Sequence, residues 1–519
     1  MAIQTTGLLF FLAIITSQQC LNLQLLLLLS FILLTWFLST WLVPGGHAWC
    51  GHRNPSRIPG PAGYPVVGSL PLMGSLAHRN LARISSRFRS LKLMALSLGF
   101  TPVIIASHPD TAREILSSPA FVDRPVKRAA RLLMFERAIG FSPHGEYWRS
   151  LRRAAAMCLF APRRLAAQEA CRQACISDVL REVEMCRAGA VQFRGALQKA
   201  ARNSIAGSVF GELNSRDKEE LGVMVREGYE ILGGFDWGDY FPAGWWPDFW
   251  GIGKRSEVLA GKVRAFVGGL VEERRKEGFQ GRDDFLSLML GMAEEERIAD
   301  SDMVALLWEL IFRGTDTVAI LMEWAMARLV LHPAIQARAQ AELDRVVGLT
   351  RHVADADLPN LPYLLSILKE TLRLHPPGPL LSWARLSIQD VHVSKSYIPK
   401  GTTAMVNMWA IAHDPNIWPD PLVFDPERFD REPISIMGSD LRLAPFGSGR
   451  RVCPGKSMGL ATCHLWLARL LHHYQWLPHV TSNKREKGLI DLRERLKLSM
   501  EMKRPLVCKA MIRNRVPFG

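Results

Sequence analysis

The ten residues FGSGRRVCPG, from Phe446 to Gly455, place one cysteine among three glycines and two arginines. Glycines permit tight turns and a close approach of the backbone to a flat ligand. Pro454 suits the start of a helix, and a helical pattern follows from Lys456 to His473. The sulfur of Cys453 is therefore expected at a helix N-terminus, where loop amides stabilise a thiolate.

Several kinds of chemistry could use a cysteine in this position. A zinc site needs further ligands at suitable spacing, and Cys463 and His464 lie ten residues on, inside a helical pattern. A cysteine hydrolase needs a nearby base, which nothing local marks, and a buried structural cysteine does not explain the glycines. A single axial thiolate on haem iron accounts for the whole loop. Arg451 could then reach a haem propionate, and Phe446 would shield the sulfur from water.

A long apolar segment, Asp302 to Leu331, predicts a central buried helix whose middle contradicts its own pattern. Gly314, Asp316 and Thr317 in that middle are poor helix formers. Two interpretations stay open: a capped kink, or a local opening that admits a small ligand beside a hydroxyl and a carboxyl suited to proton delivery.

Arg313 is the charged exception on this segment. Glu309 lies one turn earlier, in the favourable order for an ion pair. The alternative hypothesis is that Arg313 contacts a substrate carboxylate.

Charged residues elsewhere form two further patterns. Glu370 and Arg373 are three apart on a predicted helix, Leu361 to Leu374, and Arg428 follows in FDPERFD. A carboxylate shared by two guanidiniums would clamp these segments together. Trp148 and Arg152, four apart, are donors suited to the carboxylates of a cofactor, although a helix that only packs its Trp has the same pattern.

The N-terminus predicts a membrane anchor. Leu25 to Val43 is almost wholly apolar, and as a helix it would span about 28 Å. No Lys or Arg precedes Arg53, so the positive-inside rule places the following body in the cytosol. A cleaved signal peptide is the alternative, but nine cysteines without a CxxC spacing favour a reducing compartment.

The rest of the chain predicts one large, mainly α domain with a minor β-sheet portion. We expect an anchor at 1–44, a proline-rich hinge at 45–61 and a catalytic domain at 62–519, with short strands near 102–107 and 402–408. The net charge of +15 is spread along the chain and mixed with acids, which argues against a nucleic-acid partner. Anionic membrane lipid and an acidic partner protein explain it instead.

The Cys453 loop also resembles the cytochrome P-450 signature F-x-x-G-x-R-x-C-x-G, at Phe446, Gly449, Arg451, Cys453 and Gly455. GTDT, ETLR, PERF, the W-x-x-x-R pair and PGPAGYPVVG resemble the family's other motifs, in family order, from about residue 55 onward. The sequence around these motifs resembles the plant microsomal members of the family and is most similar to the plant 78A family. Arg313 stands where the family usually has Ala or Gly, and Val318 replaces a usual Thr or Ser.

The resemblance implies a cytochrome P-450 fold, haem b with Cys453 as axial ligand of the iron, and oxygen activation by Asp316 and Thr317. Phe446, Gly449 and Gly455 would line the haem, with its propionates held by Arg152 and Arg451, together with Arg385. Electrons would come from NADPH through a membrane-bound flavoprotein reductase that docks on the basic proximal surface. Two alternatives remain: a haem-thiolate isomerase or lyase, and a non-catalytic haem-thiolate sensor or ligand carrier.

The resemblance further implies a single-pass protein of the endoplasmic reticulum membrane whose catalytic domain faces the cytosol. Its substrate, oxidised with O2, would be a fatty-acid-like or other lipophilic molecule, and its role would lie in plant organ or seed growth. The expected substrate pocket includes Arg313, Leu380, Leu381 and Trp383.

Overall fold

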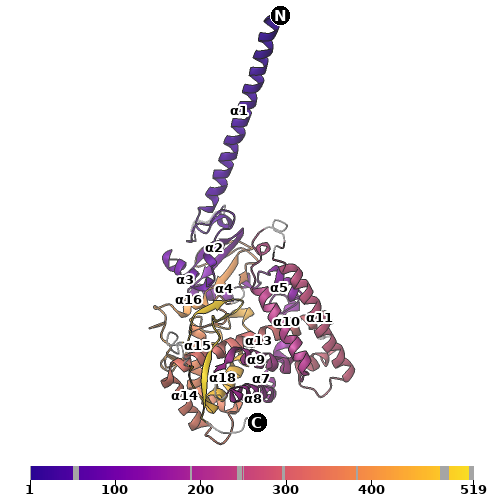
Figure 1. Ribbon diagram of the computed structural model, residues 1–519, viewed down its shortest axis with the longest axis vertical. Helices are drawn as coiled ribbons and strands as arrows, with labels where there is room; N and C mark the ends of the chain where they lie inside the picture. The colour runs from indigo at the N-terminus through magenta and orange to yellow at the C-terminus, as the bar shows by residue number, and fades with distance from the viewer. Residues whose placement is uncertain are drawn as a thin grey trace.

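One long helix, α1 (Ala2–Trp41), projects from the body of the molecule in the computed structural model (Figure 1). The structure describes residues 2–50, 58–186, 190–241, 248, 250–294, 298–381, 384–479 and 490–513. Within α1 the segment Asn22–Trp41 is long and apolar enough to cross a membrane, and only 6% of its apolar window is buried. This exposure fits the predicted anchor.

The last turn of α1 belongs to the body. Trp41 is fully buried, its ring stacks on His47 with centroids 4.8 Å apart, and its carbonyl accepts a hydrogen bond from the Gly63 amide at 2.8 Å. The anchor and the body are thus joined by packing as well as by the chain. The predicted hinge falls partly on residues 51–57, which lie outside the described residues.

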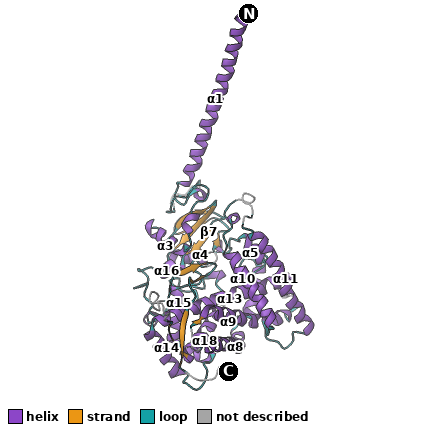
Figure 2. Cartoon of the chain, viewed as in Figure 1, coloured by secondary structure: helices purple, strands orange, loops and turns teal. Residues whose placement is uncertain are grey.

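The body is mainly helical, as expected, with small sheets at one side (Figure 2). Its longer helices after α1 are α3 (Ala77–Arg87), α4 (Pro109–Ser117), α6 (Glu146–Cys158), α8 (Glu169–Met185), α9 (Phe193–Phe210), α10 (Ser215–Gly233), α11 (Ile252–Glu277), α13 (Asp300–Leu331), α14 (Pro333–Val346), α15 (Pro362–Leu374) and α18 (Lys456–His473). Short helices are α2 (Leu70–Met73), α5 (Arg128–Leu133), α7 (Pro162–Ala167), α12 (Phe285–Leu290), α16 (Met408–Ala412) and α17 (Arg428–Arg431). Single 3-10 turns are η1 (His47–Trp49), η2 (Pro119–Phe121), η3 (Trp237–Asp239), η5 (Asp355–Asn360) and η6 (Gly449–Arg451).

The largest sheet has the strand order β1-β2-β7-β4. Its strands are β1 (Met94–Leu98), β2 (Thr101–Ala106), β7 (Thr403–Val406) and β4 (Arg385–Leu386). β2 and β7 are parallel, with Ile104 opposite Ala404, and the other two pairs are antiparallel.

The remaining strands form smaller units. A second sheet joins β3 (Val191–Gln192), β11 (Val507–Ile512) and β8 (Tyr474–Pro478), and two hairpins pair β5 (Val391–Val393) with β6 (Ser396–Ile398) and β9 (Glu494–Leu496) with β10 (Met500–Met502).

Helix α13 runs through the centre of the body and connects its two largest apolar cores. Met303 to Phe312 pack in one core, with residues of α9, α10 and α11, whereas Ala319 to Val330 pack in the other, with residues of α8, α15 and α18. Residues 313–318 lie between the two cores. The helix is continuous through this middle, so the predicted opening is not a break in the helix.

Other local predictions differ only at their ends. The helix α18 has the predicted bounds, whereas the strand predicted at 402–408 ends at Val406. The side chain of Asn407 accepts a hydrogen bond from the Ala410 amide at 3.1 Å, which caps α16 and stops the strand.

Candidate active site

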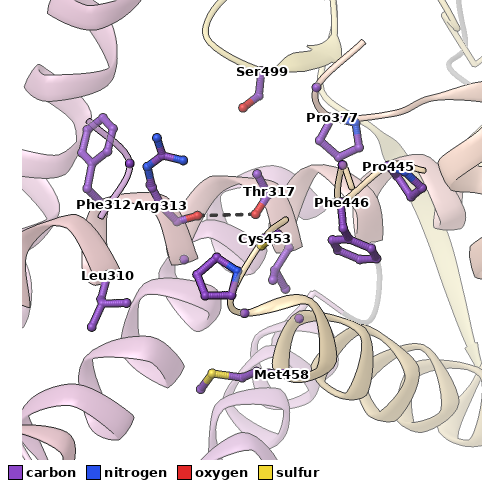
Figure 3. A pocket seen from close by; sticks show the side chains of 18 of the residues that line it. Leu310, Phe312, Arg313, Thr317, Pro377, Pro445, Phe446, Cys453, Met458 and Ser499 are labelled. Carbon is purple, nitrogen blue, oxygen red and sulfur yellow. Dashed lines mark hydrogen bonds between the residues drawn. The ribbon is translucent and has the colours of Figure 1, made fainter. Parts of the chain in front are cut away.

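A cavity lies where α13 passes from one core to the other, and Cys453 faces it from the opposite side (Figure 3). Arg313, Gly314 and Thr317 line it from α13, and the loop from Pro445 to Gly455 lines much of the other side. The two sequence features that seemed most unusual for their surroundings therefore meet across one space.

The Cys453 loop is closed by its own backbone. The Cys453 amide donates to the Phe446 carbonyl at 2.9 Å, and Gly447 turns the chain with a φ of 72°. Burial raises the pKa of the Cys453 thiol, while the Gly455 amide, which hydrogen-bonds the sulfur, acts in the opposite direction. Phe446 and Gly455 line the cavity.

Gly449 has a different role from the one we expected. Its φ is 69°, and a Cβ there would collide with the backbone carbonyl of Leu116, on α4. Gly449 is also absent from the cavity wall. This glycine allows the loop to approach another part of the protein rather than a ligand.

Four arginines besides Arg313 line the cavity: Arg124, Arg152, Arg385 and Arg451. Burial and their mutual repulsion lower the pKa of Arg385 to about 9, and burial lowers the pKa of Arg451 to about 10. The Nε and Nη1 atoms of Arg124 have no hydrogen-bond partner among the described residues, and burial holds its pKa well below the ordinary value. Such a set of enclosed cations fits a ligand with more than one anionic group.

Arg124 was missed by the sequence analysis. It stands in FVDRPVK, between a 3-10 turn and a short helix, and only the fold brings it to the cavity. Arg124 adds to the positive charge around the cavity, and its charge is one of those that lower the pKa of Cys453.

Arg451 and Trp148 hold the walls of the cavity together. Arg451 donates to the carbonyls of Val122 and Ile139 at 2.9 Å and of Ser142 at 2.7 Å, so its nitrogens already bond the chain. Trp148 Nε1 donates to the Ile139 carbonyl at 2.9 Å, and Trp148 is absent from the cavity wall. Its ring lies 4.5 Å from the Arg451 guanidinium, so Trp148 packs beside an arginine that lines the cavity, and the contact of its N–H with a cofactor stays a prediction.

Asp316 and Thr317 point to different sides of α13. Thr317 lines the cavity, and its Oγ1 lies 3.5 Å from the Arg313 carbonyl (Figure 3). Asp316 is not on the cavity wall; it accepts a hydrogen bond from Gln198 Nε2 at 3.0 Å, on α9. Burial raises the pKa of the Asp316 carboxyl. The predicted hydroxyl thus faces the cavity, and the predicted carboxyl lies behind it.

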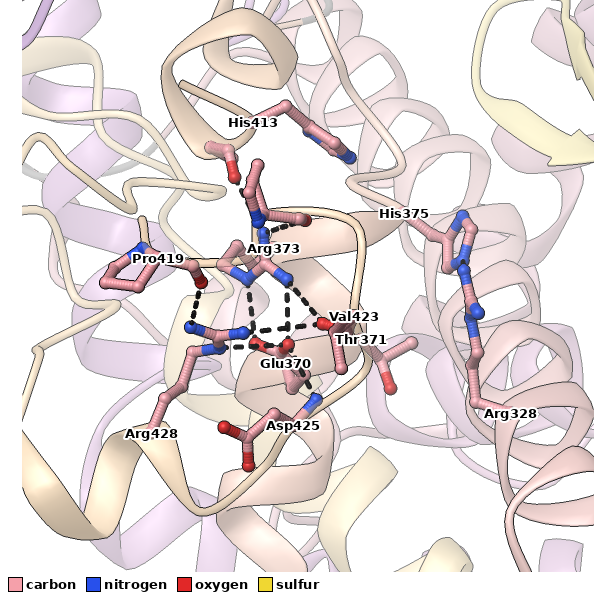
Figure 4. Close-up of polar contacts among 12 residues, drawn as sticks. Arg328, Glu370, Thr371, Arg373, His375, His413, Pro419, Val423, Asp425 and Arg428 are labelled. Atoms are coloured by element: carbon pink, nitrogen blue, oxygen red, sulfur yellow. Dashed lines mark hydrogen bonds and ion pairs between the residues drawn. The ribbon is translucent and has the colours of Figure 1, made fainter. Parts of the chain in front are cut away.

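The predicted clamp residues come together away from the cavity (Figure 4). Glu370 accepts two hydrogen bonds from Arg373, each of 2.8 Å, and one of 3.0 Å from Arg428 Nε. Arg373 also donates to the carbonyls of Ala412 and Pro421 at 2.8 Å. This network joins α15 to the segment that precedes the Cys453 loop.

The candidate substrate residues are only partly brought together. Leu381 and Arg313 line the cavity, Leu380 packs against the β1–β2 core instead, and Trp383 lies outside the described residues. Leu380 and Leu381 are neighbours in the chain, yet of the two only Leu381 lines the cavity. The structure adds cavity residues that no sequence pattern marked: Tyr229 from α10 and, from the β9–β10 turn, Leu498 and Ser499.

Comparison with known proteins finds the family that the sequence motifs resemble. The family model of cytochrome P450 matches residues 58–500. Cytochrome P450 78A5 of Arabidopsis thaliana is 49% identical over 492 residues, which cover 91% of this chain and 93% of that protein. Cytochrome P450 78A7 of the same plant is 51% identical over 481 residues and covers 89% of each chain.

Solved structures agree on the fold. A zebra fish cytochrome P450 solved with progesterone aligns with a TM-score of 0.71 at 26% identity, over 83% of this chain and 99% of that one.

Proposed function

This chain belongs to the cytochrome P450 family, as a haem monooxygenase similar to the plant 78A members, and we propose that it hydroxylates a fatty-acid-like or other lipophilic molecule. One observation supports the proposal most directly. A cysteine sulfur, a set of arginines and a threonine hydroxyl face one otherwise largely apolar cavity.

The residues of this cavity fit haem. Its two carboxylates match the enclosed guanidiniums, above all Arg124, whose Nε and Nη1 have no partner among the described residues. Arg385 and Arg152, each with a hydrogen bond to a backbone carbonyl of the Cys453 loop, would complete the set. In this proposal Arg451 acts mainly by holding the loop in place.

Cys453 would be the axial ligand of the haem iron, and bound haem would supply the activation of O2 and the transfer of one oxygen atom. The chain's own residues support that ligand. The Gly455 amide stabilises negative charge on the sulfur, and Phe446, which lines the same cavity, would shield it from water. The clamp of Glu370, Arg373 and Arg428 fixes the segment that leads into the loop.

Asp316 and Thr317 would deliver protons from two neighbouring faces of α13, the first toward α9 and the second toward the cavity. The raised pKa of Asp316 keeps a proton on its carboxyl to a higher pH than on an exposed aspartate, which suits a donor. Thr317 would hold a proton at Oγ1 on the cavity side. Gln198 orients the carboxyl from α9.

Electrons would come from NADPH through a flavoprotein reductase. The exposed apolar helix Asn22–Trp41 supports a membrane anchor, and in our proposal residues 62–519 are a catalytic domain on the cytosolic side of the endoplasmic reticulum. A role in plant organ or seed growth completes the proposal, on the similarity to the plant 78A members.

The test is product analysis of the reconstituted enzyme under 18O2. With NADPH, a plant reductase and plant lipid extract, we expect products that each gain one labelled oxygen atom. Cys453→Ala should lose both the products and the thiolate-type spectrum of the reduced carbon monoxide complex. Products that lack labelled oxygen, or form without NADPH, would support an isomerase or lyase instead.

A further inference from the structure

The cavity wall contains an ion pair at the position where the other wall residues of α13 are mostly apolar. Arg313 Nε lies 3.0 Å from Glu309 Oε1, one helical turn earlier, and both residues line the cavity. Glu309 is only 3% exposed. A buried carboxylate in a pocket for lipophilic molecules is costly to maintain without a task.

The surroundings are fitted to this pair. The Gly140 amide donates to Glu309 Oε1 at 2.8 Å, and a Cβ on Gly140 would collide with that oxygen and lie 2.5 Å from Arg313 Nη2. The Arg313 guanidinium also lies 5.4 Å from the centre of the Phe141 ring. The segment before α6 therefore gives space and contacts to the pair that a larger residue at 140 would remove.

The pair still presents polar groups to the cavity. Glu309 Oε2 has no hydrogen-bond partner among the described residues, whereas Oε1 accepts one hydrogen bond from the Gly140 amide and lies 3.0 Å from Arg313 Nε. The Arg313 side chain is 32% exposed, and the residue lines the cavity. Glu309 thus fixes one edge of the guanidinium and leaves the side chain accessible to a ligand.

The charges of the cavity favour an anionic ligand beyond haem. Five arginines and one glutamate are its charged lining residues, and Asp123 lies 3.4 Å from Arg451 just behind the wall. Ferric iron, the porphyrin ring and a thiolate are together neutral, so haem adds only its two carboxylates. The charged lining residues that the structure describes, with Asp123, then keep a net excess of one positive charge, and a cavity with an excess of one sign attracts the other.

Arg313 lies close to the predicted place of reaction. It is four residues from Thr317, a rise of about 6 Å along one face of the helix. Figure 3 shows Arg313, Thr317 and Cys453 around the same space. A carboxylate on Arg313 would therefore hold its nearest carbons, not the far end of its chain, beside Thr317.

We propose that Arg313, positioned by Glu309, binds the carboxylate of an amphiphilic acid substrate, which is then hydroxylated in the part of its chain next to the carboxylate. This rests on the proposed monooxygenase function. In the reaction one C–H bond becomes C–OH, the second atom of O2 leaves as water, and NADPH supplies the two electrons through the reductase while two protons are consumed.

The first test is ligand binding, measured by titrating the ferric Soret band with dodecanoic acid and with its methyl ester. We expect wild-type protein to bind the acid at least tenfold more tightly than Arg313→Leu does, with the ester bound equally by both. Arg313→Lys should recover part of the affinity for the acid, and Glu309→Gln should weaken it less than Arg313→Leu. The control Arg226→Leu removes a cation from an exposed ion pair and should leave both ligands unaffected.

The second measurement is the position of the hydroxyl group in the products. Wild-type enzyme should oxidise carbons near the carboxylate, and Arg313→Leu should spread oxidation along the chain. Equal loss of acid and ester affinity, failure of the wild type to bind the acid, or hydroxylation only at the methyl end would overturn the proposal. If the acid binds through Arg313 and no variant forms an oxygenated product, the monooxygenase proposal fails while the anion site stands.

Discussion

Two groups of arginines in this protein differ in the partners that surround their guanidiniums. In the clamp, Arg373 and Arg428 share the carboxylate of Glu370, and their remaining nitrogens donate to carbonyls such as those of Ala412, Pro421 and Pro419. Around the cavity, Arg124 and Arg385 have no carboxylate partner among the described residues. The nitrogens of the first group are hydrogen-bonded by the protein itself, and this group serves the fold. The second group presents positive charge to a space where a ligand with carboxylates fits.

The largest effect is expected for Glu370→Gln, which leaves two buried guanidiniums without their carboxylate. We expect a loss of about 3–5 kcal/mol in the free energy of unfolding, measured as a lower midpoint of thermal unfolding and a lower yield of haem-loaded protein. The control Glu427→Gln removes a carboxylate that is half exposed and paired with Arg338, and should cost less than about 1 kcal/mol. Equal midpoints in the two variants would remove the distinction.

A change at Gly140 tests the ion pair of Glu309 and Arg313, which lies between the two cases. In Gly140→Ala the new methyl group overlaps both side chains, and we expect a loss of about 1–3 kcal/mol from overpacking. Gly145→Ala is the matched control, because a Cβ there meets nothing within 4 Å. Thermal unfolding of both variants measures the difference, and an equal effect would show that the pair tolerates displacement.

Arg124→Leu should affect haem more than the fold. Removing this cation takes away a charge-assisted contact to a haem carboxylate, worth about 1.5 kcal/mol, or about a tenfold faster loss of haem. Transfer of haem to an excess of a haem-binding acceptor protein measures that rate. Arg131→Leu, at a 60% exposed side chain, is the control. A large drop in the midpoint of thermal unfolding with an unchanged rate of haem loss would show that Arg124 stabilises the fold, as the clamp arginines do, and does not bind haem.

The smallest expected effect concerns Asp316, a partly buried acid whose carboxylate accepts a hydrogen bond from the amide of Gln198. Its raised pKa means that the folded protein favours the protonated form, so its contribution to stability is present at low pH and is lost as pH rises through the raised pKa. Asp316→Asn should therefore be the more stable protein at pH 8, by on the order of 1 kcal/mol, and gain nothing at low pH. Thermal midpoints from pH 4 to 8 test this, with Asp178→Asn, at a 53% exposed residue, as the control.

The sequence predicted those parts of the site that depend on short spacings. Glu309 and Arg313, or Glu370 and Arg373, must meet if their segments are helical, and the Cys453 loop is almost complete within ten residues. Side-chain direction was harder, because it depends on which face of a segment the fold buries.

Leu380 and Gly449 show this limit. Leu380 adjoins a residue that lines the cavity, and Gly449 lies two residues from Gly447 and Arg451, which also line it, yet Leu380 packs in another core and Gly449 faces the Leu116 carbonyl. Arg124 is the opposite case, a cavity residue that its neighbours in the sequence do not mark. The fold alone brings it near arginines that are distant in the chain. Such convergence has no local pattern for a sequence to display.

The buried last turn of α1 has a mechanical consequence. Because Trp41 is enclosed between His47 and Phe100, the anchor is a stiff arm and not a loose tether. A tilt of this helix in a bilayer would rotate the whole body with it, and thus set the angle at which the body faces the lipid surface. A shortened protein that begins after Pro44 would lose that lever, and would expose an apolar socket where Trp41 had been.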